Sequence, residues 1–255
     1  MDPVCFYLGN RPIYWYGVLV AAAFLACIAH WAMLGKKEGR APSFSSDLGL
    51  WLMLSGIAGA RAGYVLANFG EFAARPWDMV RFDKGGLIFY GGFIAACAAL
   101  IVFARVRRER LWPLADFVVT ALPLGHAIGR IGCFVNGCCY GTPSDLPWHV
   151  ESHGLLRHPA QIYSSLLNIV IYAILLQYYP RRTREGRVFA LYLLLYPAGR
   201  FAVEFFRGDE RLRIFGFSVA QCISVVLFGA GAALWFLVPN RRPQPGKSRV
   251  QAGET

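Results

Sequence analysis

Charged side chains are scarce in this chain: only 16% of its 255 residues are charged, while 56% are hydrophobic. This composition excludes an ordinary soluble domain and fits a chain that crosses a membrane several times. Acidic residues are especially few, 15 against 26 Lys and Arg, which gives a net charge of +11. The basic residues lie in short loops between apolar runs, as membrane topology requires, so we expect no nucleic-acid partner.

Three further signals are missing. Residues 1–3 lack the basic segment of a cleavable signal peptide, so we expect none. No repeat relates the two halves of the chain, which argues against a transporter built from repeats. The Cys and His residues follow no common zinc spacing, so we expect no metal. For Cys133, Cys138 and Cys139, a disulfide, a catalytic thiol and simple packing near a pocket all stay open.

Seven apolar runs come close to the ~20 residues needed to cross a bilayer. Spanning segments of this length must be helices, because lipid offers no hydrogen bonds to the backbone. The sequence therefore predicts an all-α membrane protein with seven transmembrane helices in one domain, 1–240, followed by a basic, disordered cytoplasmic tail, 241–255. The runs lie at 13–34, 48–68, 87–104, 114–134, 161–179, 188–206 and 217–237.

The loop charges predict the orientation. One set of connections, with the tail, holds 15 Lys and Arg, and the other set holds 8. The positive-inside rule places the first set, and hence the C-terminus, in the cytoplasm and the N-terminus outside. The unusual polar residues then gather in the outer leaflet, which scattered structural charges would not do.

Arg130 is the most informative of these residues. It lies in the glycine-rich segment 129–141, which closes the fourth apolar run. A guanidinium at membrane depth costs about 2.5 kcal/mol or more, so it needs a partner or a function. An always-charged bidentate donor beside glycines favours an anionic ligand such as a phosphate.

Other polar groups each have a structural alternative. Arg200 and Glu204 are four residues apart and can pair on one helix face, which also suits a simple ion pair between helices. Arg61 follows the small residues 55–60, which allow close helix packing. Tyr90 lies between two glycine pairs in 85–92, which suggests a broken helix start lining a cavity, or an interfacial tyrosine. His158 precedes a proline and also fits a plain helix entry.

Together these segments resemble the prolipoprotein diacylglyceryl transferases, a family of bacterial membrane enzymes. Six or seven ordered matches over most of the chain are specific, although no single one is. The seven-helix, N-out topology of that family agrees with the charge distribution. The matches lie at 14–17, 59–64, 85–92 and 129–141, at His158, Pro159, Gln161 and Tyr163, at Tyr196 with 199–207, and at Gln221 and Ser224.

The resemblance implies a reaction in the outer leaflet of the bacterial inner membrane. A diacylglyceryl group moves from phosphatidylglycerol to the thiol of the lipobox cysteine in a prolipoprotein signal peptide, and glycerol phosphate leaves. The acceptor supplies the nucleophile, so no cofactor is needed; the enzyme must hold a phosphate and move a proton. We expect the catalytic residues to be Arg130, Tyr90, Arg200 and Tyr196. We expect Arg130, Asn136, Gly141, Tyr16, Arg61, His158, Glu204 and Arg207 to bind the substrate among the membrane lipids.

Three positions depart from the family pattern. Tyr90 stands where the family commonly has His, Cys133 where it has Asn, and Cys138 where it has an acidic residue. A phenol with a pKa near 10 is a poor base. The residues for phosphate binding are therefore present, while proton transfer is altered. A paralogue with a different acceptor, or a non-catalytic lipid-binding or transport protein, remains an alternative.

Overall fold

The computed structural model describes residues 3–73, 75–81, 85–214 and 216–237. Most of these residues are helical, and six helical stretches are long and apolar enough to cross a membrane. The chain is therefore a mostly helical, multi-pass membrane protein. The six stretches are Trp15–Lys37, Phe44–Ala67, Phe89–Val106, Leu111–Val135, Ala160–Arg181 and Val219–Leu237.

The helices follow the predicted runs with small shifts at their ends. Six of them are α1 (Trp15–Lys37), α2 (Phe44–Ala67), α4 (Phe89–Val106), α7 (Ala160–Tyr178), α8 (Arg187–Glu204) and α9 (Val219–Leu237). The run at 114–134 forms two helices, α5 (Leu111–Val119) and α6 (Leu122–Val135), because Pro123 starts a new helix at its first turn. Helix α8 matches the sixth predicted run but is not among the six membrane candidates.

Short elements that the sequence did not predict connect these helices. Three two-stranded antiparallel hairpins pair β1 (Val4–Leu8) with β2 (Arg11–Tyr14), β3 (Val150–Ser152) with β4 (Leu155–Arg157), and β5 (Arg213–Ile214) with β6 (Phe217–Ser218). The remaining short helices are α3 (Phe69–Ala73), η1 (Pro76–Val80) and η2 (Tyr179–Arg181). The basic tail predicted at 241–255 lies outside the described residues.

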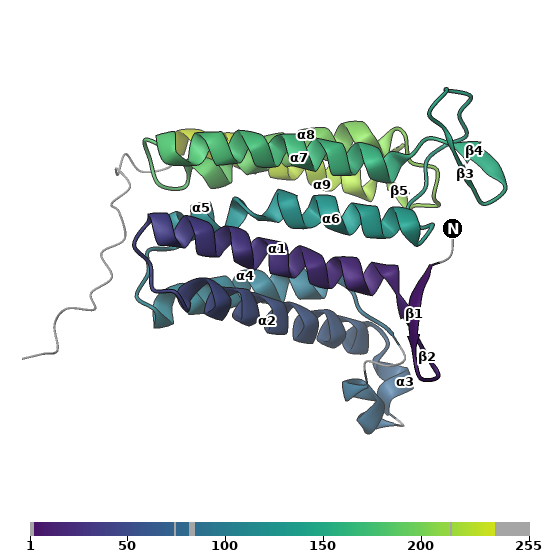
Figure 1. Cartoon of the computed structure of the whole chain (residues 1–255), viewed down its shortest axis with the longest axis horizontal. Coiled ribbons are helices and arrows are strands. Elements are labelled where there is room, and N and C mark those ends of the chain that lie inside the picture. Colours follow the sequence, from purple (N-terminus) through teal and green to yellow (C-terminus); the bar gives the residue numbers. More distant parts are fainter. Residues whose placement is uncertain (1–2, 74, 82–84, 215, 238–255) are drawn as a thin grey trace, which may run out of the picture. The chain divides into compact units, whose positions relative to one another are not determined.

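The chain divides into two compact units, and the second covers Ala32–Leu114. Its helices α2 and α4 lie side by side (Figure 1). A methyl group added to Gly59 would come within 2.7 Å of the Gly91 carbonyl oxygen, and one on Gly92 within 2.8 Å of the Gly56 carbonyl oxygen. This contact confirms the close packing predicted from the small residues of α2.

Of the residues that the structure describes, the first unit comprises 3–31, 115–214 and 216–237. Helices α6, α7, α8 and α9 pack in chain order, each against the next (Figure 1). The first half of α1 lies against α6, where the Tyr16 ring approaches Gly132. Buried polar groups find partners inside this bundle: His30 contacts Thr120 and Tyr172 at 2.8 and 2.9 Å.

A buried carboxylate fixes the start of α8. Asp116 of α5 is fully buried and accepts hydrogen bonds from the backbone N–H groups of Gly186 (2.7 Å) and Phe189 (2.8 Å). These N–H groups lie at the start of α8, where backbone N–H groups have no hydrogen-bond partners within their own helix. Asp116 therefore acts as a cap supplied by another helix, and it sets the position of α8.

Candidate active site

The chain segments that follow α6 and α8 are joined through their backbones. The Thr142 N–H donates to the Phe206 carbonyl (2.9 Å), and the Gly208 N–H donates to the Tyr140 carbonyl (3.0 Å). Gly141 lies opposite Arg207 in this bridge. A side chain on Gly141 would overlap the carbonyl oxygen of His158, so only glycine fits there. This backbone junction positions the predicted site residues on both helices.

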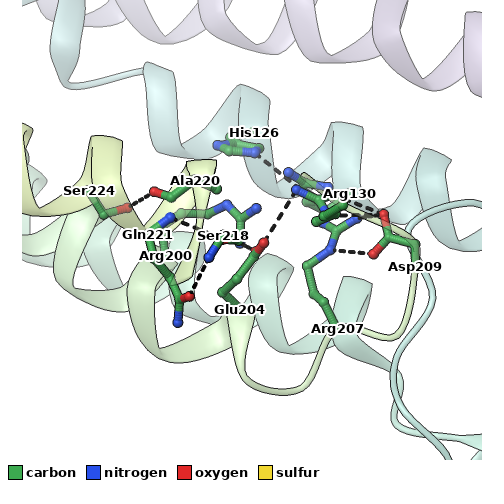
Figure 2. A network of polar contacts seen from close by, with 11 residues as sticks. His126, Arg130, Arg200, Glu204, Arg207, Asp209, Ser218, Ala220, Gln221 and Ser224 are labelled. Carbon is green, nitrogen blue, oxygen red and sulfur yellow. Dashed lines mark hydrogen bonds and ion pairs between the residues drawn. The ribbon is translucent and has the colours of Figure 1, made fainter. Parts of the chain in front are cut away.

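Arg130 lies on α6, one turn after His126. Its Nε donates a hydrogen bond to Nε2 of His126 at 3.2 Å (Figure 2). Because Nε2 accepts this hydrogen bond, it carries no hydrogen of its own. His126 is therefore neutral, with its hydrogen on Nδ1. The imidazole also packs on the Tyr196 ring of α8, with a centroid separation of 5.2 Å. Among the residues that the structure describes, no carboxylate lies within ion-pair distance of Arg130.

Arg200 and Glu204 of α8 form the ion pair predicted from their spacing (Figure 2). Glu204 is buried, with 7% of its surface exposed. It also lies 3.5 Å from Arg211. One carboxylate thus organises two guanidinium groups, and Arg200 is only partly neutralised.

Arg207 forms a bidentate pair with Asp209, at 2.9 and 2.8 Å (Figure 2). Arg211 bonds to the same carboxylate at 3.1 and 3.0 Å. Burial raises the pKa of Asp209, but the hydrogen bonds from the two arginines outweigh it and lower that pKa to about 2. Asp209 is therefore ionised at physiological pH and holds both arginines at the mouth of the site.

A cavity of about 660 Å³ lies beside these groups in the first unit. It is lined by the end of α8 and the β5–β6 hairpin, and its size suits a small polar group such as a lipid headgroup. Its charged lining residues are Glu204, Arg207, Asp209, Glu210, Arg211 and Arg213. Three arginines and three carboxylates line it, so their charges balance, and an anion would bind through the arginine side of the cavity.

Three cysteines meet where α6 ends. The Sγ atoms of Cys133, Cys138 and Cys139 all lie within 4.8 Å of one another, so these residues are able to hold a metal ion. The hydrogen bond with Cys133 and the charge of Arg207 lower the pKa of the Cys139 thiol against the opposing effect of burial. Burial and the neighbouring Cys139 raise the pKa of Cys138. The sequence spacing had not indicated this cluster.

Several predicted binding residues border the cluster. Asn136 is the C-cap residue of α6, two residues before Cys138. Tyr16 of α1 packs on Gly132, one residue before Cys133. His158 lies near Gly141, and its Nδ1 is 3.2 Å from the Tyr163 hydroxyl. The structure thus gathers Arg130, Arg200, Tyr196, Glu204, Arg207, Asn136, Gly141, Tyr16 and His158 in the first unit.

Arg61 and Tyr90 belong to the second unit. The Arg61 guanidinium donates to four carbonyl oxygens, those of Asp78, Met79, Gly85 and Gly86, at 2.5–3.2 Å. These contacts show that Arg61 holds the loop before α4. Tyr90 lies in the first turn of α4 with 53% of its surface exposed, after the non-helical stretch 85–88. That break matches the predicted interrupted helix start.

Sequence reasoning missed His126, Asp209 and Arg211 as members of the polar network. His126 precedes Arg130 by four residues, the same spacing that correctly predicted the pair of Arg200 and Glu204. A systematic search of the helices for that spacing would have found it.

The fold and these side chains define a polytopic helical membrane protein with an arginine-rich polar cluster. Comparison with known proteins narrows this class. The family model described as prolipoprotein diacylglyceryl transferase matches residues 3–237. The chain therefore belongs to the prolipoprotein diacylglyceryl transferase family.

Curated relatives support the same assignment. A protein of Methylobacillus flagellatus is 36% identical over 94% of this chain and 97% of its own length. One of Bordetella bronchiseptica is 34% identical over 92% and 94%. One of Nostoc sp. is 33% identical over 95% and 92%. All three are named phosphatidylglycerol–prolipoprotein diacylglyceryl transferase.

Proposed function

We propose that this chain transfers the diacylglyceryl group of phosphatidylglycerol to the lipobox cysteine thiol of prolipoproteins, the first step of bacterial lipoprotein maturation. The observation that carries this proposal is the state of Arg130. Its hydrogen-bond partner is the neutral His126, and no carboxylate among the described residues neutralises it. A half-buried cation without a counter-charge is a strong site for a phosphate.

The proposed reaction joins two substrates. The sulfur of the acceptor forms a bond to the carbon of the diacylglyceryl group that carries the phosphate. The bond from that carbon to the phosphate oxygen breaks. Arg130 and Arg200 stabilise the negative charge that grows on the leaving glycerol phosphate. Tyr196 packs on His126 and so supports the orientation of Arg130. Arg207, Glu204, Asn136, Gly141, Tyr16, His158 and Arg61 bind substrate or shape the site, and Tyr90 moves a proton.

The membrane arrangement of this proposal uses α8 as the seventh span. Its three charged residues make insertion of α8 into lipid unfavourable, but the ion pair of Arg200 with Glu204 reduces that cost. Seven spans and the loop charges support an N-terminus outside, a C-terminus in the cytoplasm, and Arg130 toward the outer leaflet of the inner membrane. A fluorescent reporter that folds only in the cytoplasm should glow when fused to the C-terminus; a dark fusion at normal protein level contradicts this orientation.

Complementation tests the activity. The chain should restore growth to a bacterium depleted of its own diacylglyceryl transferase. Mass spectrometry of a model prolipoprotein should then show a diacylglyceryl group on the lipobox cysteine. An unmodified cysteine, with the chain present in the membrane, would overturn the proposal. Cleavage of phosphatidylglycerol without that product would indicate a different acceptor.

Substitution of Arg130 tests the observation behind the proposal. Arg130→Ala should abolish transfer while the protein stays folded in the membrane, because the phosphate loses its main cation. The matched control is Arg105→Ala, which removes an exposed arginine at the end of α4 and should leave the rate unchanged. Full activity of a well-expressed Arg130→Ala enzyme would rule out the role given to Arg130.

A further inference from the structure

The thiol cluster at the end of α6, formed by Cys133, Cys138 and Cys139, depends on two residues with an unusual backbone conformation. Gly137 and Cys139 both adopt left-handed conformations, with φ of 70° and 62°. This conformation is costly for a residue with a side chain and persists only where the surrounding structure enforces it. The chain doubles back after α6, and the sulfur atoms of Cys138 and Cys139 come to lie within 4.8 Å of Cys133 Sγ.

Neighbouring groups hold each part of the cluster. The Cys138 N–H donates to the Cys133 carbonyl at 3.1 Å, and Nε2 of Gln161 donates to the Cys138 carbonyl at 2.8 Å. Gln161 is 4% exposed. The positive charge of Arg207 acts on the sulfur of Cys139, and two hydrogen bonds to Asp209 hold its guanidinium in place. The three sulfur atoms are therefore preorganised by a supporting shell, as a binding site requires.

The donor set indicates the ligand class. Zinc binds thiolates at about 2.3 Å, so sulfur atoms around one tetrahedral ion lie roughly 3.8 Å apart. The distances between the three Sγ atoms are at most 4.8 Å, so they exceed that spacing by no more than about 1 Å. Three thiolates and Zn²⁺ carry one net negative charge, and the guanidinium groups of Arg130 and Arg207 act on these same sulfur atoms. These positive charges therefore stabilise the negatively charged, zinc-bound form of the cluster.

We propose that Cys133, Cys138 and Cys139 bind a zinc ion whose fourth position takes the acceptor thiol of the substrate. Three protein ligands with one open position are the pattern of catalytic rather than structural zinc. This role rests on the proposed transferase function, whereas zinc binding itself does not. It also replaces the sequence-based expectation of a site without metal.

Zinc would supply the step for which the site otherwise lacks a strong base. The Nε2 lone pair of His126 already accepts from Arg130, so it is not available for a thiol proton. A thiol that coordinates zinc loses its proton outright. The sulfur electron pair then forms the carbon–sulfur bond, and the electron pair of the broken carbon–oxygen bond leaves on the phosphate. The thiol proton passes by way of Tyr90, as proposed above, to water or to the phosphate monoester, so no oxidant or reductant is required.

The first experiment measures the metal on the full-length chain, purified in detergent under reducing conditions. After loading with Zn²⁺ and desalting, the chain should retain about one zinc per molecule. Co²⁺ in place of zinc should give a thiolate-to-cobalt charge-transfer band. Each of Cys133→Ser, Cys138→Ser and Cys139→Ser should lose both signals. The matched control is Cys97→Ser, an exposed cysteine of α4 outside the cluster, which should keep them.

The second experiment measures transfer by the loaded and stripped enzyme. Removing zinc should slow transfer by about 10²-fold or more, since activation of the nucleophile is worth at least that, and Zn²⁺ should restore the rate. Bound zinc with an unchanged rate overturns the role in thiol activation. Full transfer by a chain that binds no zinc overturns the whole inference and leaves the proposed function standing.

Two other outcomes are equally decisive. If no preparation transfers lipid, the proposed function fails, and the cobalt spectrum still decides whether the metal site exists. If mass spectrometry of the chain, alkylated directly in membranes, shows two of the three cysteines joined in a disulfide, the zinc site is overturned.

Discussion

Arg130 donates its Nε hydrogen to Nε2 of His126, 3.2 Å away and one helical turn earlier on α6. This bond fixes the plane of the guanidinium without neutralising its charge. The imidazole is fixed in turn by the Tyr196 ring of α8. The anion-binding group of the site is thus oriented by a neutral partner, which leaves its charge for the substrate.

Removal of the acceptor tests this orientation. We expect His126→Leu to lower kcat/KM for phosphatidylglycerol by about 10- to 100-fold, because a hydrogen bond to a charged group is worth ~1.5–3 kcal/mol. His126→Gln keeps an acceptor oxygen and should recover part of the loss. Initial rates with lipid vesicles and a model prolipoprotein measure both. Equal rates for the wild type and His126→Leu would show that Arg130 needs no such partner.

Tyr90 offers a second test, in the other unit. We expect Tyr90→Phe to slow transfer by about 10²-fold at an unchanged protein level, because proton transfer by a positioned side chain contributes at least that factor. Phe89→Leu, at the neighbouring exposed position, changes an aromatic group without touching the phenol and serves as the control. If Tyr90→Phe keeps the wild-type rate, Tyr90 is only an interfacial anchor.

Glu204 should be important for stability as well as for activity. Glu204→Ala leaves Arg200 without its buried counter-charge and should cost about 3 kcal/mol or more in the free energy of unfolding. Thermal unfolding in detergent measures the loss as a lower Tm. The control, Glu151→Ala, removes an exposed carboxylate of β3 and should shift Tm little. An unchanged Tm for Glu204→Ala would mean that water replaces the carboxylate.

Local patterns predicted the helices well, because apolar length and helix periodicity are properties of short segments. The pair of Arg200 and Glu204 followed from the same arithmetic. The break near Pro123 was missed because residues on both sides of it are apolar. The hairpins were missed because their strands have only two to five residues, too few for an alternating pattern.

Contacts that depend on the path of a loop were not predictable. The left-handed backbone at Cys139 brings its thiol back to Cys133, and nothing in the residue type indicates that conformation. Asp209 reaches Arg207 across a turn just beyond α8, where helix spacing no longer applies. The sequence was therefore enough to nominate candidate site residues, while the partners that reach them across loops required the structure.

Arg61 serves the second unit much as a bound calcium ion serves a loop of carbonyl ligands. Its one guanidinium coordinates the backbone oxygens of four residues, two on each side of the connection between Met79 and Gly85. This cation is covalently attached and permanently charged, so it cannot dissociate or be chelated. The approach to α4 is consequently held without a metal ion, and any effect of a chelator on this protein must arise elsewhere.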